Sequence, residues 1–373
     1  MNLELHVIQN VAPANLNRDD TGAPKDAVFG GHRRARVSSQ AWKRAIRQSF
    51  SAEFGEAELA VRTRRLVDEV AARLAARGRD HEQAQVAAST VLEAAGAGLD
   101  EKTGRTKVLW LVARRSIDAL AVICEEHWDA LVGSKKLGDA TAKEVRARVQ
   151  REAIGAKAVD IALFGRMLTD APEGGTVDAA AQVAHAISTH AVATEFDYFT
   201  AVDDLTPDDE TGAGMLGTVE FNSACLYRYS CLDTDQLVAN LDGDRDLALR
   251  GALAFARGFV TVMPTGKQNT FAAHNPPAAA FVVARSVGSW NLANAFVDPV
   301  TAGRSGDLVR ASCERLARHW SDLVAVYGEP AERLGVAVLP SYADCFGTLS
   351  DAVTGSLCEV LDATIVPTFD RKS

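Results

Sequence analysis

The chain has 373 residues, of which 47% are hydrophobic and 24% charged, and its formal net charge is −9. This composition is typical of a soluble globular protein with one large domain with insertions, or with two to three domains. No apolar run approaches the roughly 20 residues of a membrane helix. The first residues lack the basic start of a signal peptide, so we expect a cytoplasmic protein without a membrane partner.

Six scattered cysteines include no CxxC pair, which fits reduced thiols and disfavours a disulfide frame or a zinc site. An acidic balance usually argues against nucleic-acid binding. A groove, however, needs only local positive charge, so the distribution of cations decides the question.

The N-terminal segment predicts a strand. Leu3, Leu5 and Val7 alternate with polar residues, among them Glu4 and His6, which we expect on a solvent-facing side. A polar loop, a basic segment and a helix follow. This β–α opening is compatible with a ferredoxin-like or RNA-recognition-type sheet. The aromatic signature of ordinary RNA-recognition domains is missing, so such a sheet would not stack bases on strand aromatics.

Residues 27–52 contain no Asp or Glu but hold six cations, Arg33, Arg34, Arg36, Lys43, Arg44 and Arg47. Gly30 and Gly31 predict a turn. The next residues alternate as a strand in which Ala35 and Val37 face a core, while Arg34 and Arg36 face outward.

Ser38 or Ser39 then caps a predicted helix, because a short hydroxyl side chain accepts a bond from the first backbone N–H groups. Its buried face consists of Trp42, Ala45, Ile46, Ser49 and Phe50. A second face carries Gln40, Lys43, Arg44 and Arg47. A helix start followed by cations can bind a phosphate chain, and a solvated basic face is the alternative. The glycine turn, double serine and basic face together favour binding.

Later segments predict a helical insertion from about Glu56 to the turn near 171–175, and then a protruding β-hairpin over 195–229 with an acidic, Gly-rich tip. The remainder predicts a helix over 244–260, a loop over 264–270, a strand over 280–284 and a helix over 307–327. Lysines and arginines between 135 and 148 are more typical of a solvated face than of a duplex-binding patch.

Several motifs offer catalytic or cofactor chemistry. Residues 212–217 match GxGxxG, but they follow an acidic turn and lead into a strand, the wrong context for a dinucleotide. His185 and His190 are badly spaced for one metal ion, so we expect core or capping histidines there. Asp19 and Asp20 beside Arg18, with Asp26 nearby, could bind a metal for phosphodiester cleavage, although such clusters more often order their own loop. A P-loop is absent at Lys267, which could still reach a phosphate.

The chain resembles the CasC family, the backbone subunit of the type I-E CRISPR Cascade complex. The resemblance runs in order over about three quarters of the chain, through NLNRDD at 15–20, KDAVFGG at 25–31, RRARVSSQ at 33–40, KR at 43–44, DIALFGRM at 160–167, HAISTH at 185–190, FTAVDDL at 199–205 and AAHNP at 272–276.

The resemblance implies an α+β hand. The palm, a modified RNA-recognition (ferredoxin-like) sheet, would span 1–58, 182–193 and 225–373. Helical fingers would span 59–181 and a β-hairpin thumb 194–224. Copies would line up along one CRISPR RNA within a complex that includes other Cascade subunits. The thumb of one copy would reach over its neighbour and displace a base at intervals, leaving the other bases to pair with target DNA.

The RNA-binding residues expected from the basic segment and this resemblance are Asn17, Arg18, Lys25, Arg33, Arg34, Ser38, Ser39, Gln40, Lys43, Arg44, Arg47, Arg166, Met167, Phe199, Leu216, Lys267, Gln268 and Asn269. The resemblance implies no cofactor, metal or catalytic residue. Because backbone contacts carry no sequence information, one subunit could hold any guide. Related backbone subunits in other CRISPR types cut target RNA with an Asp in the corresponding early loop. The alternative function is therefore a metal-dependent ribonuclease that acts on target RNA, with Asp26 or Asp19 as the candidate residue.

Overall fold

The computed structural model describes residues 1–133, 137–167, 175–201, 215–303, 306–328, 331–353 and 355–370. The chain divides into two compact units. The sheet unit comprises Met1–Ser49, Gln182–Leu232 and Ala252–Ser373, and the helical unit comprises Phe50–Ala181 and Asp233–Gly251. Both helices and an antiparallel sheet are present, so the fold is α+β.

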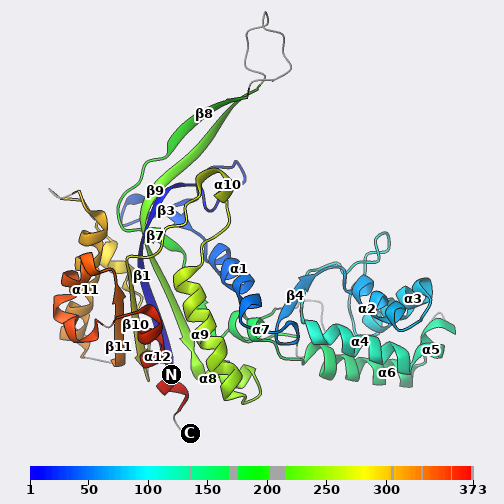
Figure 1. Ribbon diagram of the computed structural model, residues 1–373. Coiled ribbons are helices and arrows are strands. Elements are labelled where there is room, and N and C mark those ends of the chain that lie inside the picture. Colours follow the sequence, from blue (N-terminus) through cyan, green and yellow to red (C-terminus); the bar gives the residue numbers. More distant parts are fainter. Residues whose placement is uncertain are drawn as a thin grey trace, which may run out of the picture. The chain divides into compact units, whose positions relative to one another are not determined.

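The sheet unit is built on a sheet with the strand order β11-β10-β1-β9-β7-β3-β2 (Figure 1). Two further strands, β6 and β8, pair with β9 off this path. The strands are β1 (Asn2–Ala14), β2 (Asp26–Phe29), β3 (His32–Val37), β6 (Ala181–Val183), β7 (Ala186–Ser188), β8 (Glu195–Ala201), β9 (Met215–Asp233), β10 (Ala279–Arg285) and β11 (Ala331–Val338). The predicted turn is confirmed, since Gly30 and Gly31 have φ of 60° and 80° and join β2 to β3.

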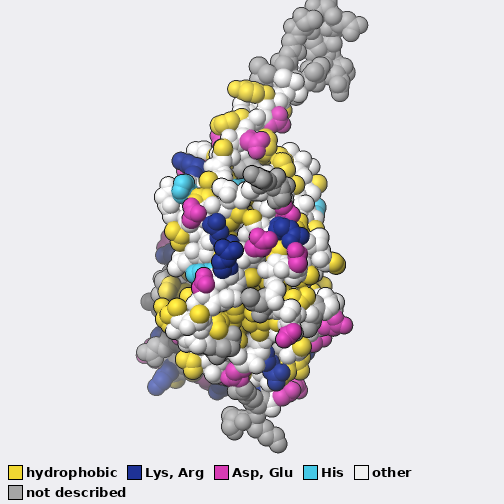
Figure 2. Space-filling model, turned by 90° about the vertical axis from the view of Figure 1, so that its left-hand side faces the viewer, with side chains coloured by type: hydrophobic (Ala, Val, Ile, Leu, Met, Phe, Trp, Pro, Cys, Tyr) yellow, Lys and Arg dark blue, Asp and Glu magenta, His cyan; other side chains and the backbone are white. Residues whose placement is uncertain are grey.

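The predicted hairpin is also confirmed. β8 pairs antiparallel with the first part of β9, from Glu195↔Phe221 to Ala201↔Met215, and β9 then continues into the sheet. Hydrophobic and acidic side chains lie together on the described arms of this hairpin (Figure 2). Residues 202–214, which include the first half of the GxGxxG match, lie outside the described part of the chain.

β1 is buried on both faces, so the prediction of a half-buried strand was wrong. Glu4 and His6, expected to face solvent, are 0% and 1% exposed. β1 lies between β10 and β9 in the middle of the sheet, with His6 opposite Phe281. Both faces of this central strand are covered. The alternating sequence of β1 therefore places apolar side chains on one buried face and hydrogen-bonded polar side chains on the other.

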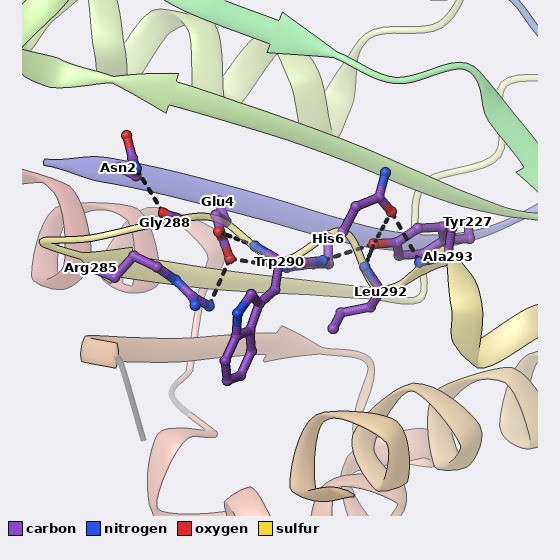
Figure 3. A network of polar contacts seen from close by, with 10 residues as sticks. Asn2, Glu4, His6, Tyr227, Arg285, Gly288, Trp290, Leu292 and Ala293 are labelled. Carbon is purple, nitrogen blue, oxygen red and sulfur yellow. Dashed lines mark hydrogen bonds and ion pairs between the residues drawn. The ribbon is translucent and has the colours of Figure 1, made fainter. Parts of the chain in front are cut away.

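Glu4 anchors the segment that follows β10 (Figure 3). Its carboxylate accepts a hydrogen bond from Arg285 Nη2 at 2.9 Å and another from the backbone N–H of Trp290 at 2.6 Å. A buried carboxylate needs such donors, because burial without them is costly. The hydrogen bond from Trp290 therefore fixes the course of the chain beyond β10.

His6 extends this buried network to β9 (Figure 3). Its Nδ1 lies 2.9 Å from Tyr227 Oη, and the same hydroxyl accepts the backbone N–H of Leu292 at 2.9 Å. Burial lowers the pKa of His6, although the hydrogen bond and charge of Glu4 act in the opposite direction. The neutral imidazole is thus the form that fits the fold.

Helices cover both faces of the sheet, α11 on one and α12 with α9 on the other (Figure 1). The predicted strand over 280–284 and the helices over 244–260 and 307–327 are confirmed by β10, α9 and α11. Trp320 of α11 packs edge-on against Phe281, with ring centroids 4.9 Å apart, at the centre of the core on that face. The helices are α1 (Ser39–Ser49), α9 (Arg245–Thr261), α10 (Gln268–Phe271), α11 (Leu308–Tyr327) and α12 (Leu357–Phe369), and the 3₁₀ segments are Leu292–Phe296 and Pro340–Ala352.

The helical unit has its own core, made by α2, α3, α4 and α6 with the two-stranded sheet β4-β5. The predicted range 59–181 falls in this unit, which also takes in 233–251. Its elements are β4 (Ala60–Thr63), α2 (Leu66–Ala76), α3 (His81–Ala94), β5 (Trp110–Ala113), α4 (Arg114–Glu126), α5 (Trp128–Gly133), α6 (Asp139–Arg148), α7 (Val159–Phe164) and α8 (Thr234–Asn240), with 3₁₀ segments at Phe50–Ala52 and Glu56–Glu58 and a π-helical turn at Val149–Ile154. In the described ranges, no helix combines the length and apolarity needed to cross a bilayer.

Candidate nucleic-acid interface

The sheet unit holds an open groove of about 800 Å³ that collects residues from three distant segments. One wall is the loop after β1, another is α1, and the third is the loop before α10. The lining residues are Leu16, Asn17, Arg18, Asp19, Asp20, Thr21, Gly22, Ser38, Gln40, Ala41, Arg44, Ala45, Gln48, Pro264, Thr265, Gly266 and Lys267. The cations Arg18, Arg44 and Lys267 thus meet in one groove, and no aromatic side chain lines it within the described chain.

α1 forms as predicted, and Gln40 and Arg44 of its predicted polar face line the groove. Ser38 Oγ accepts the backbone N–H of Ala41 at 3.3 Å, which caps the helix, while Trp42 and Ile46 are buried. The backbone N–H of Ser38 donates to Asn17 Oδ1 at 2.8 Å, which ties the start of α1 to the neighbouring loop. These contacts set the position of Gln40 and Arg44 along the groove.

Asp19 orders the loop that carries Arg18. Its carboxylate accepts hydrogen bonds from the Thr21 hydroxyl at 2.7 Å and from the backbone N–H groups of Thr21 and Ala23 at 2.9 and 3.0 Å. The hydroxyl bond of Thr21 is the main reason that the pKa of Asp19 is lowered. Asp19 therefore closes its own loop, which is the structural role predicted for the cluster of Arg18, Asp19 and Asp20.

The loop over 264–267 approaches the first loop closely at Gly266. A Cβ atom there would collide with the carbonyl oxygen of Leu16, so only glycine fits. Lys267 follows with a left-handed φ of 49°, and Gln268 holds the loop by donating from Nε2 to the Pro264 carbonyl at 3.2 Å. This close approach brings Lys267 to the groove lined by Arg18, more than two hundred positions earlier in the chain.

The groove gathers six of the sequence-predicted site residues, Asn17, Arg18, Ser38, Gln40, Arg44 and Lys267. Lys25 lines a smaller hollow that shares Asn17 with the groove. The other predicted residues of this region do not line the groove. Lys43 and Arg47 are half-buried on α1, burial lowers the pKa of Lys43, and Asn269 is exposed in α10.

Arg34 is not at the surface, so the prediction that it faces outward was wrong, and its burial argues against the predicted contact with RNA. Its side chain is 0% exposed, and the guanidinium donates to backbone carbonyl oxygens, among them those of Thr189 at 2.9 Å and Phe296 at 2.8 Å. The β2-β3 hairpin thus packs against the segment at Phe296 and Val297, which covers the Arg34 side chain. Arg33 is exposed and forms an ion pair with Asp26.

Arg166 and Met167 lie in the helical unit, and only Met167 is accessible. Arg166 is 6% exposed, and its guanidinium donates to the carbonyl oxygens of Gly175 at 2.8 Å and Ile154 at 2.7 Å, so its predicted contact with RNA was wrong for the side chain. Met167 is 79% exposed. Phe199, on β8, is 40% exposed, and the side chain of Leu216 lies outside the described part.

The two histidines that are badly spaced for one metal ion hold backbone groups, in line with the predicted core or capping roles, and His185 lies at the start of α1. The imidazole Nδ1 of His185 accepts the backbone N–H of Ser39 at 2.9 Å. Burial lowers the pKa of His185, and the charges of Arg36 and Lys25 lower it further. His190 accepts the backbone N–H of Cys225 at Nε2, 3.1 Å away. Both histidines thus hold backbone groups, which their spacing alone could not reveal.

Among the residues that the structure describes, the acidic side chains near the groove do not form a metal-binding cluster. Within the described ranges, no group of three His, Cys, Asp or Glu side chains is placed to hold a metal ion. Asp19 is occupied by its loop and Asp26 by Arg33.

A family model described as CT1975-like protein matches residues 3–358. The chain belongs to this CT1975-like family. It is similar to a solved chain titled "CRISPR RNA-guided surveillance complex, pre-nicking", with 34% identity, a TM-score of 0.88, and coverage of 98% of this chain and 100% of that chain. A chain titled "CRISPR RNA-guided surveillance complex" is 28% identical, with a TM-score of 0.76 and coverage of 98% and 100%. A comparison with curated proteins finds no match. The family match and the two structural similarities together support a Cascade-type protein.

Proposed function

We propose that this chain is the CRISPR RNA-binding backbone subunit of a type I-E Cascade surveillance complex. The observation that carries the proposal is the groove, in which Arg18, Arg44 and Lys267 meet beside the start of α1. Cationic side chains bind phosphates, whereas the groove offers no aromatic platform for bases within its described lining. A site of this chemistry holds the guide by its backbone whatever its sequence.

In this proposal the sheet unit is the palm, a modified RNA-recognition sheet, the helical unit supplies the fingers, and β8 with β9 forms the thumb. Copies polymerise along one guide RNA in the cytoplasm together with other Cascade subunits. Bases that the protein does not grip remain available to pair with target DNA, so sequence is read by pairing and the protein senses charge and shape. The similarity to two chains from RNA-guided surveillance complexes supports this arrangement.

The test is the salt dependence of RNA binding. We expect Arg44→Ala combined with Lys267→Ala to weaken binding to unrelated RNA sequences equally, and to flatten the plot of log affinity against log salt by about 0.7 per lost phosphate contact. Arg318→Ala, an exposed arginine of α11 that does not line the groove, is the control and should keep the wild-type slope. An unchanged slope in the folded double variant would refute the groove as the RNA site.

We further propose that the chain has no catalytic role in this complex. Asp19 and Asp26 already serve as acceptors for Thr21 and Arg33, and the described residues include no group of three His, Cys, Asp or Glu side chains placed to hold a metal ion. The rival function, a metal-dependent ribonuclease, is tested by incubating the assembled complex with complementary RNA and Mg²⁺. Intact RNA supports the scaffold, whereas cleavage abolished by Asp26→Ala or Asp19→Ala would establish the nuclease.

A further inference from the structure

A buried arginine of the sheet unit contacts α1 from the side opposite the groove. Arg228 of β9 is 1% exposed, and its guanidinium carbon lies 3.7 Å from the centroid of the Trp42 ring on α1. Trp42 is also 1% exposed, so the contact is made inside the core. A cation over the face of a tryptophan ring is attracted by the ring, most strongly where water is excluded. Arg228 therefore holds the helix that carries Arg44 into the groove.

The same guanidinium holds the end of α9, the helix that precedes the loop before α10. It donates to the backbone carbonyl oxygens of Phe259 and of Val260, the latter at 3.4 Å. Both belong to the last turn of α9, where carbonyl groups lack donors within the helix and carry the negative end of its dipole. A cation is favourable at this place. α9 ends at Thr261, and the residues of this loop that line the groove begin at Pro264.

Gln9 of β1 extends the network to both ends of the loop before α10. Its Oε1 accepts a hydrogen bond from Arg228 Nη1 at 2.6 Å. Its Nε2 donates to the Asn275 carbonyl oxygen at 2.6 Å and lies 3.0 Å from Met263 Sδ. Met263 and Asn275 stand on either side of the segment that carries Lys267. One buried glutamine thus holds the base of this loop and joins it to Arg228.

A buried cation without a carboxylate partner is costly at a core position. The described hydrogen bonds of Arg228 go to Gln9 and to backbone carbonyl oxygens, and none of them goes to a carboxylate. Burial lowers the pKa of Arg228 to about 9, so the guanidinium keeps its charge at neutral pH. An apolar side chain of similar volume often fills such a site with equal or better stability. The contacts of Arg228 with α1, Gln9 and the end of α9 therefore point to a role in position.

We propose that Arg228 and Gln9 are positioning residues, which set the separation of α1 from the loop before α10 so that Arg44 and Lys267 contact one RNA strand at the same time. Neither Arg228 nor Gln9 lines the groove, so both act through the two cations. This inference rests on the proposed function, because it concerns how the groove is shaped for its ligand. Loss of the network should remove phosphate contacts, and not stability alone.

The separation of the two walls is measured first, in the full chain and without RNA. Gln40→Cys on α1 and Asn269→Cys on α10 supply exposed sites for two nitroxide labels. Cys358→Ser removes the exposed native thiol, and the other five cysteines are buried. Double electron-electron resonance then gives the distribution of distances between the labels.

Two variants perturb the network, and a third is the matched control. Gln9→Glu keeps an acceptor for Arg228 but turns an oxygen toward the Asn275 carbonyl, so it should release the loop. Arg228→Met fills the site without hydrogen bonds and should release both walls. Both variants should give a longer mean label distance and a broader distribution. Arg285→Met is the control, because Arg285 is buried and lies 4.5 Å from the ring of Trp290 but far along the strand order from α1, and lines no part of the groove. It should lower stability and keep the wild-type distances.

Fluorescence anisotropy with RNA then shows whether the network acts through the cations. We expect Gln9→Glu to weaken binding about fivefold and to flatten the plot of log affinity against log salt by about 0.7, the value for one phosphate contact. In that background Lys267→Ala should change the affinity less than about twofold, whereas Arg44→Ala should keep its full effect. Arg228→Met should flatten the plot by about 1.4, the value for two contacts. Arg285→Met should keep the wild-type slope.

Additive effects of Gln9→Glu and Lys267→Ala would overturn the proposal, because independent residues add. So would wild-type label distances in both network variants, or displaced walls with an unchanged salt slope. If Arg228→Met does not fold, Gln9→Glu and its combination with Lys267→Ala decide the question. If the wild type binds no RNA, the proposed function fails, and the label distances still decide whether Arg228 and Gln9 set the separation of the walls.

Discussion

Replacing Arg34 by Ala tests whether this residue holds the sheet unit together or binds RNA. The guanidinium donates to the backbone carbonyl oxygens of Phe29 at 3.4 Å, Ser188 at 3.3 Å, Thr189 at 2.9 Å, Phe296 at 2.8 Å and Val297 at 3.1 Å. The side chain is 0% exposed. Its removal would leave a cavity lined by carbonyl groups that water does not reach in the native fold.

The expected loss follows from the three shortest of these bonds. A hydrogen bond from a charged donor contributes about 1.5–3 kcal/mol net. Two effects reduce the sum. The buried guanidinium loses its hydration, which lowers the pKa of Arg34, and the Thr189 carbonyl keeps a second donor, the N–H of Val300 at 2.9 Å. We therefore expect Arg34→Ala to lower the free energy of unfolding of the sheet unit by about 3–4 kcal/mol.

Urea denaturation followed by circular dichroism measures this loss, with Arg33→Ala as the matched control. Arg33 is the neighbouring arginine, but its side chain is 61% exposed in its ion pair with Asp26, so we expect a change below about 1 kcal/mol. The folded fraction of Arg34→Ala should keep the wild-type salt slope for RNA. Wild-type stability together with a flatter slope would refute the structural role and make Arg34 an RNA ligand.

Two further predictions concern the groove and the buried network. Gly266→Ala should weaken RNA binding and destabilise the sheet unit by roughly 2 kcal/mol, because the new Cβ collides with the Leu16 carbonyl oxygen. The control is Gly347→Ala, since Gly347 has open space around it. This control should match the wild type in thermal denaturation and in the anisotropy measurement of RNA binding. Equal behaviour of both variants would contradict the close approach. Lowering the pH from about 7.5 to about 6 should destabilise the sheet unit, since the unfolded chain takes up a proton near the ordinary His pKa of 6.5 that buried His6 resists. His6→Gln should show a shallower pH dependence in urea denaturation, and an equally steep one would assign the effect to other groups.

The amino-acid sequence determined the local structure around the site. The double serine and the three- and four-residue spacing of Trp42, Ala45 and Ile46 predicted α1 and its polar face, because capping and amphipathic burial are local effects. The glycine pair predicted the turn before β3, and the aromatic and acidic arms predicted the β8-β9 hairpin. The charge inversion in an acid-free segment pointed to α1, and of the six cations in that segment Arg44 lines the groove.

Only the tertiary structure decided which of these side chains reach solvent. Arg34 and Arg36 look equivalent in an alternating strand, yet Arg34 is enclosed by carbonyl groups from segments far along the chain, and Glu4 and His6 are buried because β1 is central. The meeting of Lys267 with Arg18 and Arg44 depends on the close approach of Gly266 to Leu16, a long-range contact without a local signal. Local patterns specify helices, strands and turns, whereas burial and the joining of distant cations depend on how those elements pack.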